Sequence, residues 1–280
     1  MKIWLNMHFL KSKNKLLLLL LMALLTACSS EIRLARSIQK DMSQIALLCD
    51  FPDYIILTNS TVEMPKNMSE EEQLSFYDSA FNSSQFIQYI DDTSFMRKFQ
   101  QNIMQEFEHY NVRVFGENQL DEFLSSDGVL YIANFKQLEL EERWEPYHAE
   151  EQFDSLIYEE DFWLMGISMN AWVDVAKIND TVEVQRQLYM ESVLKDNVDG
   201  MFFQNQWTGE VHYQYRLDTL QVDDVWELEI QSAEDFSLKI MNTIINKEIR
   251  DRLDYSEGIE PVNDWKISPS SGRLLPEILH

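Results

Sequence analysis

The spacing of the apolar residues changes along the chain, and this change restricts the folds that the chain can adopt. Between Phe95 and Phe107, large apolar residues recur every four positions, as on one face of a helix. Between Phe162 and Ile178 they alternate with other residues, as in a half-buried strand, and one face holds Trp163, Met165, Ile167, Met169, Ala171, Val173 and Val175. Helical spacing returns between Phe236 and Leu253. The sequence therefore predicts an α+β fold.

The first half of the chain is expected to alternate helices and strands. We expect a helix over residues 29–46, a strand over 54–58, a polar loop over 59–75 with a helical turn near 70–77, a helix around 95–107, a strand over 112–115, a helix over 117–124 and a strand over 129–140. Thr93 or Ser94 is expected to cap the helix around 95–107, and Asn111 to adopt a left-handed conformation after it. This order is typical of an α/β unit.

The second half is expected to form an antiparallel β-meander covered by a C-terminal helix. Its strands are predicted over 162–178, 182–190, 211–217 and 226–230, with a tight turn at residues 179–180. Asp196 to Gly200 is predicted to be a turn, because it lacks the alternating ligands of a calcium loop. Ser232, with Asp235, is expected to start the helix. We therefore predict one composite domain over residues 28–255 and an extended tail over 256–280.

The N-terminus has the three parts of an export signal. Lys11, Lys13 and Lys15 flank the apolar run Leu16–Leu25, and small residues precede Cys28. The segment Leu25-Thr26-Ala27-Cys28 resembles the lipobox of the type II signal peptide of Gram-negative bacterial lipoproteins. The resemblance implies cleavage before Cys28, attachment of a diacylglycerol to its sulfur and acylation, typically by palmitate, of its new amine. Residues 1–27 would then be a signal peptide, and Met7 would serve equally well as the first residue.

The resemblance also implies a location. Ser29 in place of an aspartate favours the outer membrane by analogy with Gram-negative lipoproteins, while the periplasmic and the surface face both stay open. An uncleaved anchor is the competing interpretation, but residues 16–27 fall short of the roughly 20 apolar residues that span a bilayer. Cys49 is expected to be a buried, inert thiol; a Cys28–Cys49 disulfide would require the lipobox interpretation to be wrong.

The chain is strongly acidic. Without the four lysines of residues 1–27, 19 of its 23 basic residues remain against 48 acidic residues, a formal net charge of −29. This charge argues against nucleic acid and anionic headgroups as partners. Only seven glycines are present, which argues against glycine-rich loops that bind phosphate or a cofactor. We predict no cofactor.

No sequence motif indicates a catalytic or a metal site. His-Glu-x-x-His and Gly-x-Ser-x-Gly are both absent from the sequence. His148 stands near Glu150 and Glu151, an arrangement that suits a metal or an acid–base site but is more typical of a solvated acidic loop, and we favour the loop. We therefore predict no metal ligand and no catalytic residue, and the chain is more consistent with a non-enzyme than with an enzyme.

Two groups of residues support an alternative, glycan-directed function. Acidic residues gather at Glu139, Glu141 and Glu142 and again at Glu159, Glu160 and Asp161. Glycoside hydrolysis uses two carboxyl groups across a cleft, but adjacency in sequence does not establish that geometry. Trp144, Trp172 and Trp207 provide faces on which sugar rings stack, unless they are buried in the core.

Four segments resemble the acceptor of periplasmic O-glycosylation in some Gram-negative bacteria, in which Asp-[Ser/Thr] is followed by a small or aliphatic residue. The acceptor hydroxyls are those of Ser79, Ser155, Thr181 and Thr219. Such residues are also common in turns, so chance matches are expected. Thr181, at the expected turn, is predicted to be the most accessible.

These observations favour one functional hypothesis over a second. The lipobox and the lack of a catalytic motif favour a lipid-anchored envelope protein that acts as a binding or assembly accessory for envelope proteins. In the order of its elements, the first half is similar to transport-accessory lipoproteins. The alternative is a glycan-binding or glycan-hydrolysing lipoprotein that uses the residues between Trp144 and Asp161.

Overall fold

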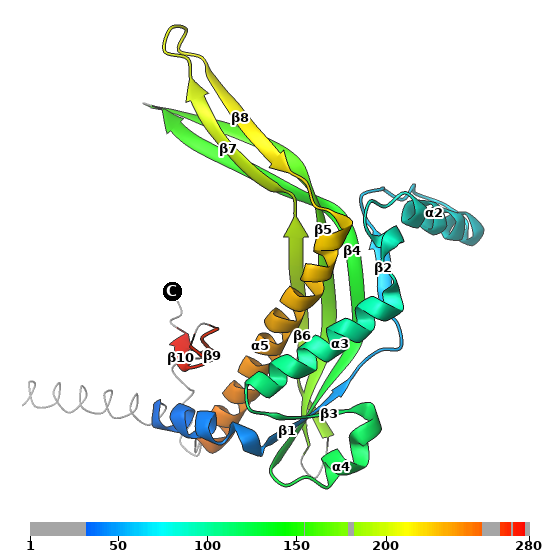
Figure 1. The fold of residues 1–280 in the computed structure, drawn as a ribbon, viewed down its shortest axis with the longest axis vertical. Coiled ribbons are helices and arrows are strands. Elements are labelled where there is room, and N and C mark those ends of the chain that lie inside the picture. The colour runs from blue at the N-terminus through cyan, green and yellow to red at the C-terminus, as the bar shows by residue number, and fades with distance from the viewer. Residues whose placement is uncertain (1–31, 154, 179–181, 254–263, 270, 278–280) are drawn as a thin grey trace, which may run out of the picture.

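The computed structural model describes residues 32–153, 155–178, 182–253, 264–269 and 271–277 (Figure 1). Residues 32–40 are helical. The α-helices that follow are α2 (Glu70–Asn82), α3 (Asp92–His109), α4 (Leu120–Leu124) and α5 (Val225–Arg252). Short 3-10 turns are η1 (Met42–Gln44), η2 (Ile87–Tyr89), η3 (Glu117–Gln119) and η4 (Val222–Asp224). The strands are β1 (Ile45–Asp50), β2 (Ile56–Asn59), β3 (Arg113–Gly116), β4 (Val129–Phe153), β5 (Leu156–Ile178), β6 (Val182–Lys195), β7 (Asn197–Gln204), β8 (Val211–Asp218), β9 (Asp264–Ile267) and β10 (Leu274–Glu277). The predicted α+β class is confirmed.

The main sheet joins a parallel part to an antiparallel part. Its strand order is β3-β1-β4-β5-β6, and β2 pairs with β4 further along the same edge as β1. Strand β1 is parallel to β3 and β4, and β2 is parallel to β4, whereas β4, β5 and β6 are antiparallel. Strands β7 and β8 pair only with each other among the described strands. The antiparallel strands expected over 162–178, 182–190 and 211–217 are thus present, and they are divided between two sheets.

Helices α3 and α5 cover one face of the main sheet, and much of the other face is open (Figure 1). Beneath the two helices, the ring of Phe99 lies edge-on to those of Phe51, Phe135 and Phe236, at centroid distances of 6.1–6.4 Å. On the opposite face, α4 covers only the end of the sheet, where Phe123 packs on Ala46 and Leu48. The predicted cover of a C-terminal helix over the sheet is confirmed.

Helix α5 begins earlier than the sequence predicts. A strand was expected over 226–230 and a helix start at Ser232, but the helix runs from Val225. Leu228, Ser232 and Phe236 are all buried at helical spacing, whereas Ile230 is exposed. Three alternating apolar residues are too few to distinguish the two periods, and the buried serine concealed the longer helical row.

Several boundaries in the first half also differ from expectation. The first helix ends at residue 40, and residues 45–50 form the buried strand β1. Strand β1 lies between two parallel neighbours, and such a strand is apolar along its whole length rather than at alternate positions, so its sequence does not show the period of a strand. The next strand lies at Ile56–Asn59 rather than 54–58. The expected turn near 70–77 is the 13-residue helix α2, which a capping box between Ser69 and Glu72 starts.

The cap of α3 was predicted incorrectly, whereas its end was predicted correctly. The carboxylate of Asp91, rather than Thr93 or the side chain of Ser94, accepts the N–H of Ser94 at 2.7 Å. Asn111 has φ of 61°, the predicted left-handed conformation. Strand β4 continues 13 residues beyond the expected end at Leu140.

The structure also revises two segments that were expected to be irregular. The predicted turn over residues 196–200 is wrong, because strand β7 begins at Asn197. Part of the expected tail forms the hairpin β9–β10, whose Trp265 is buried against α5 and exchanges hydrogen bonds with Asn246. The turn expected at residues 179–180 lies outside the described residues.

A buried acid lies between α3 and α5. The side chain of Glu229 is 2 % exposed, and its carboxyl accepts the amide N–H of Asn102. Burial raises the pKa of Glu229 to about 7, although the nearby Lys98 and the bond from Asn102 oppose this rise. The proton is therefore bound more tightly in the folded chain than in the unfolded chain, where the pKa is near 4.5.

We predict that Glu229 makes the protein less stable as the pH rises. The folded state is favoured below pH 4.5 and loses this advantage as the pH rises through 7, which costs up to roughly 3 kcal/mol. Glu229→Gln should therefore unfold at higher urea concentration than the unmodified protein at pH 8, and the difference should shrink at pH 5. Glu234→Gln, an exposed site on the same helix, should change neither value. Equal effects of both variants at pH 8 would contradict the prediction.

Candidate binding site on a projecting arm

Strands β4 and β5 extend well beyond the strands that flank them. The pairing of β2 with β4 ends at Glu142, and the pairing of β6 with β5 ends at Gly166. Beyond this point, residues 144–153 and 155–165 form a two-stranded ribbon, and the hairpin β7–β8 projects beside it (Figure 1). We call residues 144–165 and 197–218 the arm. Ten residues of β4 at about 3.3 Å each give the ribbon a length of roughly 30 Å.

An aromatic cluster joins the two hairpins of the arm. The ring of Phe162 lies 4.7 Å from that of Tyr147 and 5.0 Å from that of Tyr215, nearly parallel to the latter. The hydroxyls of Tyr147 and Tyr213 are 2.7 Å apart. Burial and this bond raise the pKa of Tyr213 to about 12, so its hydroxyl keeps its proton at neutral pH. A Cβ at Gly200 would overlap the ring of Tyr213, and the glycine therefore allows the ring to lie across β7.

A buried carboxylate fixes the base of the arm. Asp196, between β6 and β7, is buried and accepts the N–H of Met165 at 3.1 Å and that of Leu220 at 2.9 Å. Its own N–H donates to the carbonyl of Met165 at 2.9 Å. One residue thus connects β5, the start of β7 and the chain that follows β8. Hydrogen bonds to a charged group are worth roughly 1.5–3 kcal/mol each.

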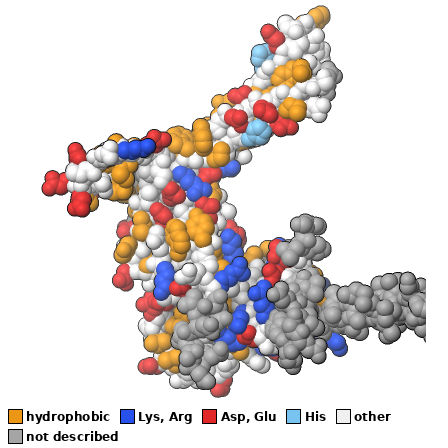
Figure 2. All heavy atoms as spheres, turned by 180° about the vertical axis from the view of Figure 1, so that it is seen from behind, with side chains coloured by type: hydrophobic (Ala, Val, Ile, Leu, Met, Phe, Trp, Pro, Cys, Tyr) orange, Lys and Arg blue, Asp and Glu red, His pale blue; other side chains and the backbone are white. Residues whose placement is uncertain are grey.

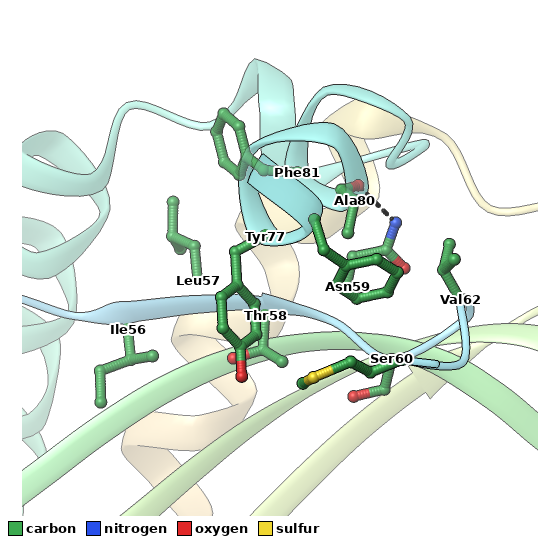
Figure 3. Close-up of a pocket in the computed structure, with 11 residues that line it drawn as sticks. Ile56, Leu57, Thr58, Asn59, Ser60, Val62, Tyr77, Ala80 and Phe81 are labelled. Carbon is green, nitrogen blue, oxygen red and sulfur yellow. Dashed lines mark hydrogen bonds between the residues drawn. The ribbon is translucent and has the colours of Figure 1, made fainter. Parts of the chain in front are cut away.

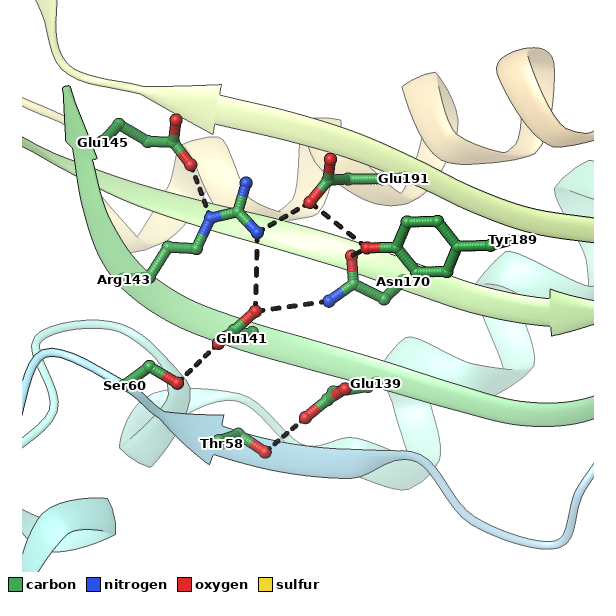
Figure 4. A network of polar contacts seen from close by, with 9 residues as sticks. All are labelled: Thr58, Ser60, Glu139, Glu141, Arg143, Glu145, Asn170, Tyr189 and Glu191. Carbon is green, nitrogen blue, oxygen red and sulfur yellow. Dashed lines mark hydrogen bonds and ion pairs between the residues drawn. The ribbon is translucent and has the colours of Figure 1, made fainter. Parts of the chain in front are cut away.

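Arg143 crosses the open face of the sheet below the arm (Figure 4). Its guanidinium lies 2.5 Å from Glu145, 2.6 Å from Glu191 of β6 and 3.5 Å from Glu141. Partial burial opposes its charge, but the bonds to Glu145 and Glu191 prevail and raise the pKa of Arg143. A Cβ at Gly166 would lie 2.7 Å from the side chain of Glu145, so the glycine provides the space for the ion pair.

The polar network continues across the open face. Tyr189 donates to Asn170 at 3.1 Å, and the amide of Asn170 donates to Glu141 at 3.4 Å. Glu141 and Glu139 accept the hydroxyls of Ser60 and of Thr58 in β2, at 2.5 and 2.7 Å respectively (Figure 4). These carboxylates have protein partners, so the network connects strands and is not a free binding site.

The arm itself is acidic and exposes apolar side chains. Residues 144–165 contain seven acidic and no basic residues, and residues 197–218 contain three acidic residues and one arginine, a net of −9. Figure 2 shows acidic, histidine and hydrophobic side chains along the arm, with most of the visible basic side chains on the body. The exposed large apolar residues of the arm are Trp144, Leu156, Ile157, Trp163, Met201, Phe203, Trp207, Tyr215 and Leu217.

The tryptophans expected either to bind sugar or to be buried are all partly or fully exposed. Trp207 is 96 % exposed in the turn between β7 and β8, and Trp172 packs on Tyr189 on the open face of the sheet. Trp144 and Trp163 are 47 % and 65 % exposed and, together with Glu63, line a hollow of about 580 Å³. Trp163 was predicted to lie on the apolar face of the strand over 162–178. It is nevertheless exposed, because the helices that cover this face of β5 in the body do not reach the arm.

The acidic clusters do not form a paired-carboxyl site. Glu142 is buried on the face opposite Glu139 and Glu141, and it accepts the backbone N–H groups of Gln85 and Phe86 at 2.7 and 2.8 Å. Glu159 and Glu160 project to opposite faces of the ribbon, as adjacent strand residues must. The six acidic candidates are thus divided among interstrand contacts, a buried anchor and exposed positions.

His148 lies in an exposed cross-strand group. Its Nδ1 is 2.8 Å from Asp161 of β5 and its Nε2 is 3.8 Å from Glu150. The hydrogen bond to Asp161 raises the pKa of His148. These side chains are exposed rather than enclosed in a cleft, and no cluster among the described residues is suited to hold a metal ion. Sequence reasoning associated His148 with Glu150 but missed Asp161, which only the strand register brings near.

Three of the four O-glycosylation candidates lie at exposed positions. Ser79 is on α2, Ser155 is in the turn between β4 and β5, and Thr219 follows β8. Thr181 lies outside the described residues. Among the described candidates, Ser155 lies at the exposed end of the arm, in a turn like the one that was expected for Thr181.

Neither the thiols nor the comparisons add a functional site. Cys49 is a free thiol, completely buried in β1, and burial raises its pKa; Cys28 lies outside the described residues. None of the described helices is long and apolar enough to cross a membrane. No protein-family model matches the chain, and no curated protein matches it. The arm is the surface most clearly distinguished by its shape, charge and exposed apolar residues.

Proposed function

We propose that this chain is a lipid-anchored protein of the cell envelope that acts as a non-enzymatic binding or assembly accessory, and that its arm engages a basic partner protein. The observation that carries this proposal is the arm, which combines a net charge of −9 with nine exposed large apolar side chains. Large apolar side chains that gather on one exposed part of a protein are typical of interaction surfaces. The negative charge favours a partner surface rich in lysine and arginine.

The anchor is a separate part of this proposal. It rests on the resemblance of Leu25-Thr26-Ala27-Cys28 to a lipobox. Each buried methylene contributes about 0.8 kcal/mol, and one acyl chain alone binds a bilayer only marginally, so the several chains of a lipoprotein are needed to hold it. The outer membrane is the proposed location, on either its periplasmic or its surface face.

We predict that the arm forms crosslinks that the body does not. A photoreactive benzophenone amino acid at Trp207 should crosslink one partner in native membranes, whereas the same group at Leu124, an exposed apolar residue of α4, should not. Neutralising the arm with Glu159→Gln, Glu160→Gln and Asp161→Asn should reduce the adduct several-fold, because it removes charge that attracts a basic surface. The measurement is the yield of adduct on a denaturing gel.

The crosslinking experiment has a clear contrary result. Equal adducts from both positions, an adduct unaffected by the three neutralising changes, or a solitary monomer under all conditions would contradict arm-mediated binding. Glu70→Gln, Glu71→Gln and Glu72→Gln on α2 remove the same charge outside the arm and should leave the adduct unchanged.

We predict that Cys28→Ala releases the protein from membranes. The substitution removes the sulfur to which the diacylglycerol would be attached. Metabolic labelling with palmitate should be lost, and the protein should move from the membrane pellet to the soluble fraction. Cys49→Ala is the matched control and should retain the label. Continued labelling of Cys28→Ala would exclude the lipobox interpretation.

The hollow between two tryptophans favours a second candidate function, glycan binding. Trp144 and Trp163 lie on the same face of the ribbon. The carboxyl group of Glu63, which also lines the hollow, provides a hydrogen-bond acceptor. Rigid aromatic faces and a carboxylate are groups that bind sugar rings and their hydroxyls.

If the hollow binds a glycan, Trp163→Ala should weaken that binding at least about tenfold, a loss of 1.4 kcal/mol or more. A glycan array followed by calorimetry with envelope polysaccharides measures this effect. Trp172→Ala, another exposed tryptophan away from the hollow, should bind as the unmodified protein does. An array without any bound glycan would rule out this candidate.

A further inference from the structure

Strand β2 has one paired edge and one free edge. It pairs with β4 alone among the described strands, over only four residues, from Ile56↔Glu139 to Asn59↔Glu142. The N–H of Ser60 donates to the backbone carbonyl of Glu142 in β4. Because alternate residues of a strand direct their N–H and C=O groups to opposite edges, those of Leu57 and Asn59 point to the edge away from β4. A free edge of this kind is a template for another strand.

An apolar hollow of about 650 Å³ adjoins this free edge (Figure 3). All five consecutive residues from Ile56 to Ser60 line it, which one face of a strand cannot do, so the hollow lies along the edge of the strand. Helix α2 forms its other wall, and the remaining lining residues are Val62, Met64, Phe76, Tyr77, Ala80 and Phe81.

The two walls are held in place by contacts inside the fold. The amide of Asn59 donates to the carbonyl of Ala80 at 2.8 Å, which ties β2 to α2. On the other side, the hydroxyls of Thr58 and Ser60 bind carboxylates of β4. The hollow is thus part of the folded structure, and its width is set by a buried hydrogen bond.

We propose that this groove binds an extended segment of a partner protein, which adds a strand to the free edge of β2. Backbone groups of the segment would bond to the outward peptide groups at Leu57 and Asn59, and alternate aliphatic side chains would enter the hollow beneath α2. Helix α2 carries Glu70, Glu71, Glu72 and Asp78 and no basic residue, so lysine or arginine flanks the aliphatic residues of the segment. This site is separate from the arm.

The proposal is tested by selecting a phage-displayed library of random dodecapeptides on the full-length, detergent-solubilised protein. Tyr77 is an exposed residue of the hollow, and Tyr89 is an exposed tyrosine outside it. Peptides enriched on the unmodified protein should bind Tyr89→Ala equally well and Tyr77→Ala at least about tenfold more weakly. They should carry alternating aliphatic residues with basic flanks.

A second measurement tests the strand pairing itself. A synthetic copy of an enriched peptide, methylated on alternate backbone nitrogens, should lose binding at least about tenfold in fluorescence anisotropy, whereas methylation in the other register should have less effect. Leu57→Pro, which removes one outward N–H, should weaken binding while the circular dichroism spectrum stays unchanged.

Three outcomes overturn the proposal. The first is a selection that enriches no peptide, and the second is enriched peptides that are indifferent to both Tyr77→Ala and backbone methylation. The third is sedimentation of the protein as a dimer that Tyr77→Ala dissociates, which would make a second copy of this chain the occupant. Because no readout involves the arm or the lipid, these outcomes are independent of the proposed function.

Discussion

The continuous pairing of β4 with β5 is the constraint on which the rest of the structure depends. The ladder runs from Leu130↔Ile178 in the body to Phe153↔Leu156 at the end of the arm, with one irregularity near Lys136. Its lower half is the centre of the main sheet and supports α3 and α5. Its upper half has no helix above it. The same backbone hydrogen bonds therefore serve both a buried sheet and a projecting ribbon.

The two halves of this ladder are stabilised by different interactions. In the body, one face of the sheet is buried by aliphatic and aromatic side chains beneath the helices. A two-stranded ribbon alone is marginally stable in water. The arm is supported instead by the aromatic cluster between its hairpins, by the buried carboxylate of Asp196 and by the ion pairs of Arg143. These contacts leave the outer surface of the arm free for other molecules.

The sequence predicted the regular parts of the body better than the arm. Helix α3 and the central part of β5 were predictable because each has one buried face with a clear period. The start of α5 was not, since buried Ser232 interrupts its apolar row. Of the candidate site, Trp144 and Trp207 were identified from residue type alone. The joining of His148 to Asp161 depends on strand register, and the free edge of β2 depends on which strands pair, so neither could be read from local patterns.

The length of one hairpin also determines how far the protein extends. The helix over residues 32–40 lies at the end of the molecule opposite to the arm (Figure 1). Strand β4 has 25 residues, which at about 3.3 Å each span roughly 80 Å at most. If Cys28 carries the proposed anchor, the molecule would act as a spacer. The number of residues in β4 and β5 would then set the height above the bilayer at which the arm is held.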